Sequence, residues 1–155
     1  MGIKFSVVIP SFNNAKALML TLTSLELQTF PKNRFEVIVV DDGSEDGTAE
    51  AIDGYKPPYM LTFIVNEGRH GRAYTRNVGA NAAKGKYLVF IDADFLLVPE
   101  CLQTLYSYHH RYPEHVISGF PESTHAVYTQ YYPQFSDHKK KENAPDSPAA
   151  WLMEK

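Results

Sequence analysis

Short, nearly continuous runs of apolar residues, each ended by polar or acidic residues, constrain the fold of this 155-residue chain more than any other feature. Runs of this kind, without polar alternation, predict strands that are buried on both faces in a mainly parallel sheet. Helical patterns separate most of the runs, so the sequence predicts an α/β fold with helices covering both sides of the sheet. The predicted strands are residues 5–10, 35–40, 60–65, 87–91 and 116–118.

The first predicted helix follows the first strand. Asn13 or Asn14 suits its N-cap position, because the side chain of asparagine can accept a hydrogen bond from a free N–H of the first turn. Leu18, Leu22 and Leu25 then form one apolar stripe at helical spacing, which predicts packing against the sheet. Later helices are predicted over residues 71–83, ending before a glycine at position 85, and from residue 99 to about residue 112.

Periodic patterns end after Gly119, and the chain length suits one ordinary domain. We therefore expect a single folded core over residues 1–119 and an irregular segment over residues 120–155. The formal net charge of −3 provides no basic field for phosphates of nucleic acid, which is therefore not an expected partner.

The cellular location is predicted from what the sequence lacks. Cys101 is the single cysteine and cannot form an internal disulfide, no export signal is visible, and no apolar run approaches the roughly 20 residues that cross a bilayer. A cytoplasmic protein without a membrane span is expected. The lysine run at 139–141 is interpreted as a solvated segment, and its functional alternative is peripheral contact with anionic lipid at the inner face of the membrane.

Polar residues follow three of the predicted strands, at residues 11–14, 41–48 and 92–94. The carboxyl ends of parallel strands share one edge of a sheet, and ligands bind outside that edge. Several carboxylates crowded there would repel one another unless a cation stabilised them. Asp92 and Asp94 are two residues apart, so an extended backbone would direct both side chains to one side, which suits Mg²⁺ or Mn²⁺. Such an ion could bridge the carboxylates to a nucleoside diphosphate.

Glycine patterns exclude the commoner nucleotide-binding motifs. Neither the dinucleotide fingerprint G-x-G-x-x-G after the first strand nor the phosphate loop G-x-x-x-x-G-K-[ST] occurs in the sequence. The phosphates would have to be held in another way.

Four blocks of sequence resemble the family 2 glycosyltransferases in residue identity, order and spacing. They are residues 7–13 (VVIPSFN), 39–48 (VVDDGSEDGT), 76–79 (RNVG) and 85–94 (GKYLVFIDAD). The resemblance covers roughly residues 5–119 and implies a three-layer GT-A fold with a mainly parallel sheet. It assigns nucleotide-sugar binding to residues 1–119 and the start of an acceptor-side region to residues 120–155, so that the acceptor side is expected to be truncated.

The resemblance also implies roles for individual residues. Asp42 would accept a hydrogen bond from the base, usually uracil. Asp92 would lie on the ribose side and could join Asp94 as a metal ligand. Arg76 would lie near the nucleotide with help from Arg72, although Thr75 stands where the family usually has alanine. The remaining donor-binding residues that the resemblance implies are Pro10, Ser11, Phe12, Asn13 and Ala93.

The activity implied by the resemblance is transfer of a sugar, of the hexosyltransferase type, from a UDP-sugar or similar donor to a saccharide or lipid-linked acceptor, with inversion and a divalent metal. The family's catalytic base lies in a Glu-Asp-type motif downstream of the D-x-D, and this sequence does not contain it. The main alternative is therefore a nucleotide-sugar-binding fragment or remnant without transfer activity. Homo-oligomerisation through apolar surface is a further expectation.

Two other enzyme classes share parts of the pattern. A HAD-type phosphatase carries its D-x-D after the first strand, whereas here the motif follows the fourth. A sugar nucleotidyltransferase would ordinarily carry a glycine-rich, basic loop after its first strand, and residues 11–16 contain no glycine. Asp46, Gly47 and Thr48 are interpreted as a turn and helix start.

Overall fold

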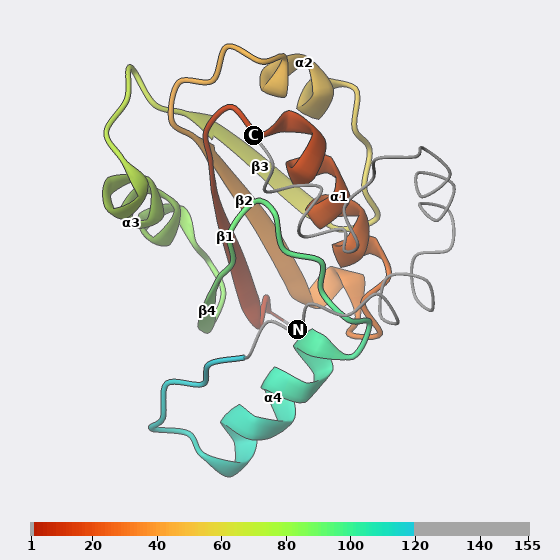
Figure 1. The fold of residues 1–155 in the computed structure, drawn as a ribbon. Coiled ribbons are helices and arrows are strands. Elements are labelled where there is room, and N and C mark those ends of the chain that lie inside the picture. Colours follow the sequence, from red (N-terminus) through yellow and green to blue (C-terminus); the bar gives the residue numbers. More distant parts are fainter. Residues whose placement is uncertain (1, 120–155) are drawn as a thin grey trace, which may run out of the picture.

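The computed structural model describes residues 2–119. Its centre is a sheet of four parallel strands in the order β3-β2-β1-β4 (Figure 1). The predicted strands at the first four positions are confirmed, with boundaries within one residue of those expected. Their bounds are Phe5–Ser11 for β1, Phe35–Asp41 for β2, Met60–Val65 for β3 and Tyr87–Phe90 for β4.

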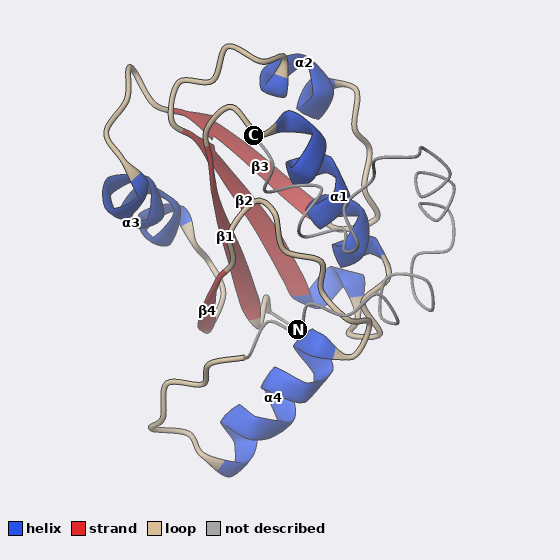
Figure 2. Ribbon diagram, viewed as in Figure 1, coloured by secondary structure: helices blue, strands red, loops and turns tan. Residues whose placement is uncertain are grey.

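Helices lie on both faces of this sheet, with α3 on one side and α1 and α2 on the other (Figure 2). This arrangement confirms the predicted three-layer α/β fold. The helices are α1 (Ala15–Glu26), α2 (Thr48–Asp53), α3 (Arg72–Ala82) and α4 (Cys101–Arg111), with a short 3-10 turn, η1, at Lys32–Arg34. In the described part of the chain, no helix is both long and apolar enough to cross a membrane.

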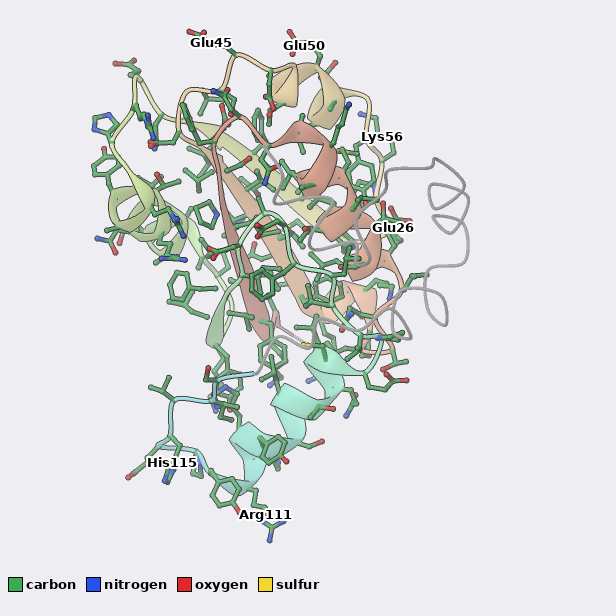
Figure 3. All side chains as sticks on the ribbon, viewed as in Figure 1. Glu26, Glu45, Glu50, Lys56, Arg111 and His115 are labelled. Carbon is green, nitrogen blue, oxygen red and sulfur yellow. The ribbon has the colours of Figure 1, made fainter. Side chains whose placement is uncertain are left out.

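The main core lies on the α1 face of the sheet. Strand residues Val7 and Val37 point to this face, where the predicted stripe of Leu18, Leu22 and Leu25 on α1 is fully buried. Alternate residues of the same strands face α3, so both faces of β1 and β2 are buried, as the continuous apolar runs predict. Charged side chains such as Glu45 project outward at the periphery (Figure 3).

On the other face, α3 lies unusually close to the sheet. A Cβ atom added to Gly79 would lie 2.3 Å from Cγ1 of Val8 and 3.2 Å from Cγ2 of Val40. The absence of a side chain at this position therefore sets the distance between the helix and strands β1 and β2. It also fixes where the N-terminal end of α3 lies relative to the carboxyl ends of the strands.

The predicted strand at 116–118 is wrong, because these residues form no regular element and Val116 is 99% exposed. A strand needs a partner for its backbone hydrogen bonds, and within residues 2–119 this short run pairs with no other strand.

Leu88 and Phe90 on β4 are also exposed, since β4 forms one edge of the described sheet. The predicted homo-oligomer stays a prediction.

Candidate functional site

A hollow of about 360 Å³ lies outside the carboxyl ends of the strands, where the sequence predicts a ligand site. Residues following β1, β2, β3 and β4 all contribute to its wall, so the topology brings together segments that are far apart in sequence. Most of the side chains singled out by the sequence line this pocket: Pro10, Ser11, Phe12, Asp42, Arg72, Asp92, Ala93 and Asp94.

Asn13, which is also predicted to bind the donor, holds two loops together in this structure. Its N–H donates to Oγ of Ser44 at 2.8 Å, and its Oδ1 accepts from the N–H of Glu45 at 2.8 Å. The backbone φ of Asn13 is 48°, a left-handed conformation that asparagine tolerates better than most residues. These bonds join the loop after β1 to the loop after β2; the donor-binding role of Asn13 stays a prediction.

Asp46 secures the same pair of loops, which agrees with the structural interpretation of this residue. The side chain of Asn14 makes no capping bond at the start of α1; instead Oδ2 of Asp46 accepts from the N–H of Ala15 at 2.8 Å. Burial alone would raise the pKa of Asp46, but hydrogen bonds from the Thr48 hydroxyl and the Ala15 N–H outweigh it and lower the pKa. The carboxylate thus replaces the predicted asparagine cap.

Asp42 is buried at the end of β2, and its carboxylate is surrounded by donors from the protein itself. Oδ1 accepts from the side-chain amide of Asn66 at 2.8 Å, Oδ2 accepts from the N–H of Gly71 at 2.7 Å, and the N–H of His70 lies 3.1 Å from both oxygens. Burial would raise the pKa of Asp42, but these hydrogen bonds outweigh it and the pKa lies below its ordinary value. Asp42 therefore anchors the segment that leads into α3 while still lining the pocket.

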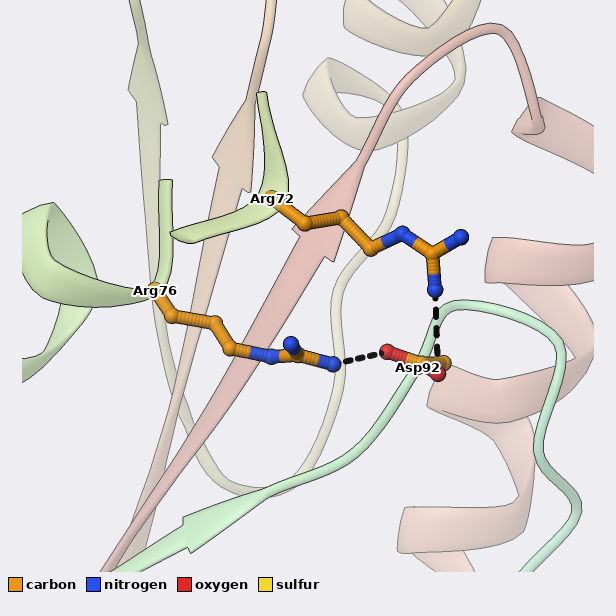
Figure 4. A network of polar contacts seen from close by, with 3 residues as sticks. All are labelled: Arg72, Arg76 and Asp92. Carbon is orange, nitrogen blue, oxygen red and sulfur yellow. Dashed lines mark hydrogen bonds and ion pairs between the residues drawn. The ribbon is translucent and has the colours of Figure 1, made fainter. Parts of the chain in front are cut away.

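Asp92, the first residue of the D-x-D, is paired with two arginines of α3 (Figure 4). Nη2 of Arg76 lies 2.6 Å from Oδ1, and Nη1 of Arg72 lies 3.8 Å from Oδ2. Each oxygen of the carboxylate thus faces one guanidinium group. Arg76 does not itself line the pocket, but it acts on the pocket through Asp92.

Asp94, the second residue of the D-x-D, lines the pocket and forms no hydrogen bond or ion pair with residues 2–119 through its carboxylate. The motif does not lie in extended backbone, because the N–H of Phe95 donates to the carbonyl of Asp92 and closes a turn. The sequence-based prediction assumed an extended backbone through Asp92 and Asp94, and this assumption is wrong. Asp94 is the open carboxylate of the motif, and Asp92 is the paired one.

The sequence predicts several carboxylates at this edge that need a cation, but most of them have partners within the protein. Asp41 accepts hydrogen bonds from the N–H and hydroxyl of Ser44, Asp42 accepts from three protein donors, and Asp92 is ion-paired. The protein therefore stabilises most of these carboxylates without an added cation. Within the described residues, no group of three or more histidine, cysteine or carboxylate side chains is arranged to hold a metal.

The segment after β3 contributes residues at or beside the pocket that the sequence motifs do not include. Asn66 supports Asp42 and Thr75, and Arg69 lines the pocket with its guanidinium group 4.2 Å from the ring centre of Phe12. Asn66 directly follows β3, as Asp42 directly follows β2, so its place after a strand was the available signal. The lysine run at 139–141, for which contact with anionic lipid is the functional alternative, lies outside the described residues.

Comparisons with known proteins agree with this geometry. The profile of the family described as Glycosyl transferase family 2 matches residues 6–149. The uncharacterized glycosyltransferase YfnE of Bacillus subtilis is 33% identical over 141 residues, which is 91% of this chain and 35% of YfnE. This chain thus spans about a third of that relative's length.

Solved structures of glycosyltransferases have the same fold. The structure of S. aureus TarS 1–349 in complex with UDP-GlcNAc is 32% identical and covers 78% of this chain and 38% of its own, with a TM-score of 0.68. The mannosyltransferase PcManGT from Pyrobaculum calidifontis, in complex with GDP-Man and Mn²⁺, is 32% identical and covers 59% of this chain and 27% of its own, with a TM-score of 0.57. The chain therefore belongs to the family 2 glycosyltransferases and has a fold of the GT-A type.

Proposed function

We propose that this chain binds a UDP-sugar in the pocket at the carboxyl edge of the sheet and serves the transfer of the sugar, with inversion, to an acceptor hydroxyl. The observation that carries the proposal is the convergence of the D-x-D motif, Asp42 and the turn after β1 on a single pocket. The complexes of TarS with UDP and with UDP-GlcNAc support a uridine nucleotide as the ligand. A cytoplasmic location and a saccharide or lipid-linked acceptor are part of the same proposal.

The hydrogen bonds of Asp42 favour uracil over guanine. An ionised carboxylate can accept about four hydrogen bonds, and Asp42 already accepts from three protein donors. Uracil offers a single ring N–H, which one remaining acceptor position can satisfy. Guanine presents a ring N–H and an adjacent amino group, which together require two acceptors. A guanine base would therefore leave a donor unsatisfied in this pocket.

The residues of the pocket fit a divalent ion that is held mainly by its substrate. Mg²⁺ typically binds through one or two carboxylates together with phosphate oxygens and water, and Asp94 offers such a carboxylate. Asp92 could contribute an oxygen only in competition with Arg72 and Arg76. A bound Mg²⁺ or Mn²⁺ would supply Lewis-acid stabilisation of the negative charge on the leaving diphosphate.

Within residues 2–119, no carboxylate that follows the D-x-D lines the pocket as a candidate for the catalytic base. Glu100 and Glu114 are the carboxylates that follow the D-x-D within the described residues, and neither lines the pocket. This observation favours the second candidate function, in which the chain binds the donor without transferring its sugar. Loss of a general base typically slows a reaction by about 10²–10⁴-fold.

Calorimetric titration of the chain with UDP and GDP, in the presence of Mg²⁺, tests the proposal. We expect UDP to bind about 10-fold more tightly than GDP, because guanine leaves one buried donor unsatisfied. Equal affinities would contradict the role of Asp42, and no binding of either nucleotide would contradict the proposed function. Incubation with UDP-sugars and a panel of acceptors, followed by mass spectrometry, then separates transfer from binding alone.

Asp94→Asn is expected to remove most of the gain in UDP affinity that Mg²⁺ provides, because the open carboxylate of the motif is lost. The loss should be at least about 10-fold, since even residues that merely support a metal ligand are worth that much. Affinity for UDP in EDTA should not fall. Asp53→Asn on the exposed surface of α2 is the matched control. An unchanged response to Mg²⁺ in Asp94→Asn would place the metal elsewhere.

A further inference from the structure

Arg72 and Arg76 share one carboxylate, but their contacts with it are unequal (Figure 4). Arg76 lies 2.6 Å from Asp92, at the distance of a charge-assisted hydrogen bond, and its side chain is 36% exposed. Arg72 lies 3.8 Å from Asp92, beyond hydrogen-bond distance, and its side chain is 76% exposed. One carboxylate neutralises one guanidinium group. The charge of Arg72 is therefore largely uncompensated by the protein and is available to a ligand in the pocket.

The place of Arg72 in its helix points the same way. Arg72 is the first residue of α3, where the helix dipole is positive and a cation is disfavoured. The first turn of α3 contains no acidic residue that would offset this repulsion. The fold therefore gains little from a cation at this position, yet the side chain of Arg72 lines the pocket. A negatively charged ligand would turn the unfavourable position into a favourable one.

We propose that Arg72 is a phosphate-binding residue, which leaves Asp92 when the donor binds and donates hydrogen bonds to the diphosphate. Arg76 stays on Asp92 and acts as a positioning residue for that carboxylate. A guanidinium group suits this role because its planar donors match two phosphate oxygens at once. The inference rests on the proposed function, since it requires a nucleoside diphosphate in this pocket. It implies that the chain retains affinity for the diphosphate without a divalent ion.

Calorimetry with uridine and UDP, both in EDTA, separates the phosphate contact from the nucleoside contacts. The wild-type chain should bind UDP more tightly than uridine. In Arg72→Ala the affinity for UDP should fall about 10- to 100-fold, as expected for the loss of hydrogen bonds to a charged group, whereas uridine should bind as before. Arg111→Ala removes the same charge from the exposed end of α4, away from this pocket, and should alter neither affinity.

Two further variants distinguish phosphate binding from positioning. Arg72→Lys keeps the charge without the planar fork and should recover part of the UDP affinity. Arg76→Ala should weaken uridine and UDP by similar factors, because it disturbs Asp92 and not the phosphate contact. Added salt should reduce the preference for UDP over uridine in the wild type and have little effect on it in Arg72→Ala.

The outcomes separate this inference from the proposed function. If uridine and UDP both bind and Arg72→Ala retains the wild-type preference for UDP, the phosphate role of Arg72 is wrong and the proposed function stands. If Arg76→Ala loses UDP selectively while Arg72→Ala does not, the two roles have been exchanged and the inference is overturned. If the wild-type chain binds neither ligand, with or without Mg²⁺, the proposed function fails and the inference fails with it.

Discussion

Asp42→Ala is expected to lower the free energy of unfolding by about 3 kcal/mol. The change would leave the buried Asn66 amide without its acceptor, and a buried donor without a partner costs about 1–3 kcal/mol. The partly buried N–H groups of His70 and Gly71 lose the same acceptor and add to the loss. Urea denaturation followed by circular dichroism measures the loss. Affinity for uridine should fall in the same variant, because the proposed acceptor for the base is also removed.

Two controls make this result specific. Asp53→Ala removes an exposed carboxylate and should change stability by no more than about 0.5 kcal/mol. Because folding lowers the pKa of Asp42, the stability that comes from its ionised form is present above the unfolded pKa of about 3.9 and is lost as pH falls through the folded pKa. The difference between the wild type and Asp42→Ala should therefore shrink below about pH 4. A loss below 1 kcal/mol at neutral pH would show that water replaces the carboxylate.

Gly79→Val is the second substitution with a large expected effect, about 3 kcal/mol or more of lost stability. Even a single Cβ atom would lie 2.3 Å from Val8, and the stiff valines of two strands cannot move aside without shifting the sheet. Helix propensity alone favours valine over glycine by a few tenths of a kcal/mol, so a measured loss would come from packing.

Ala73→Val is the matched control, because Ala73 lies on the exposed face of the same helix. Its cost should be limited to the propensity difference, about 0.5 kcal/mol. Val8→Ala introduced together with Gly79→Val should recover part of the lost stability, since it removes the atom that lies closest. Equal stabilities for Gly79→Val and Ala73→Val would show that α3 can move away from the sheet freely.

The sequence predicts the layers of this fold because its signals are local and strong. The continuous apolar runs of β1 and β2 and the leucine stripe of α1 each determine an element without reference to the rest of the chain. The failed strand at 116–118 shows the limit of such signals, because strand formation also depends on a partner that local composition does not reveal.

The pocket was predictable in position but not in its internal contacts. Polar residues after parallel strands must meet at one edge, so the location of Asp42, Asp92 and Asp94 follows from topology. Which carboxylate is paired and which is open depends on the reach of Arg72 and Arg76 from α3 and on a turn within the D-x-D. The spacing of residues along the chain predicts neither the reach of the two arginines nor the turn within the D-x-D.

The bonds between the loops after β1 and β2 have a consequence for how the pocket can vary. Asn13 joins Ser44 and Glu45, and Asp46 joins Ala15, so each loop is held in shape by the other. Residues in one bonded network do not contribute independently, and the energetic effects of substituting Asn13 and Asp46 should fail to add. An insertion in either loop would displace Ser11 and Phe12 on one wall of the pocket. A redesign of donor specificity here must therefore alter both loops together.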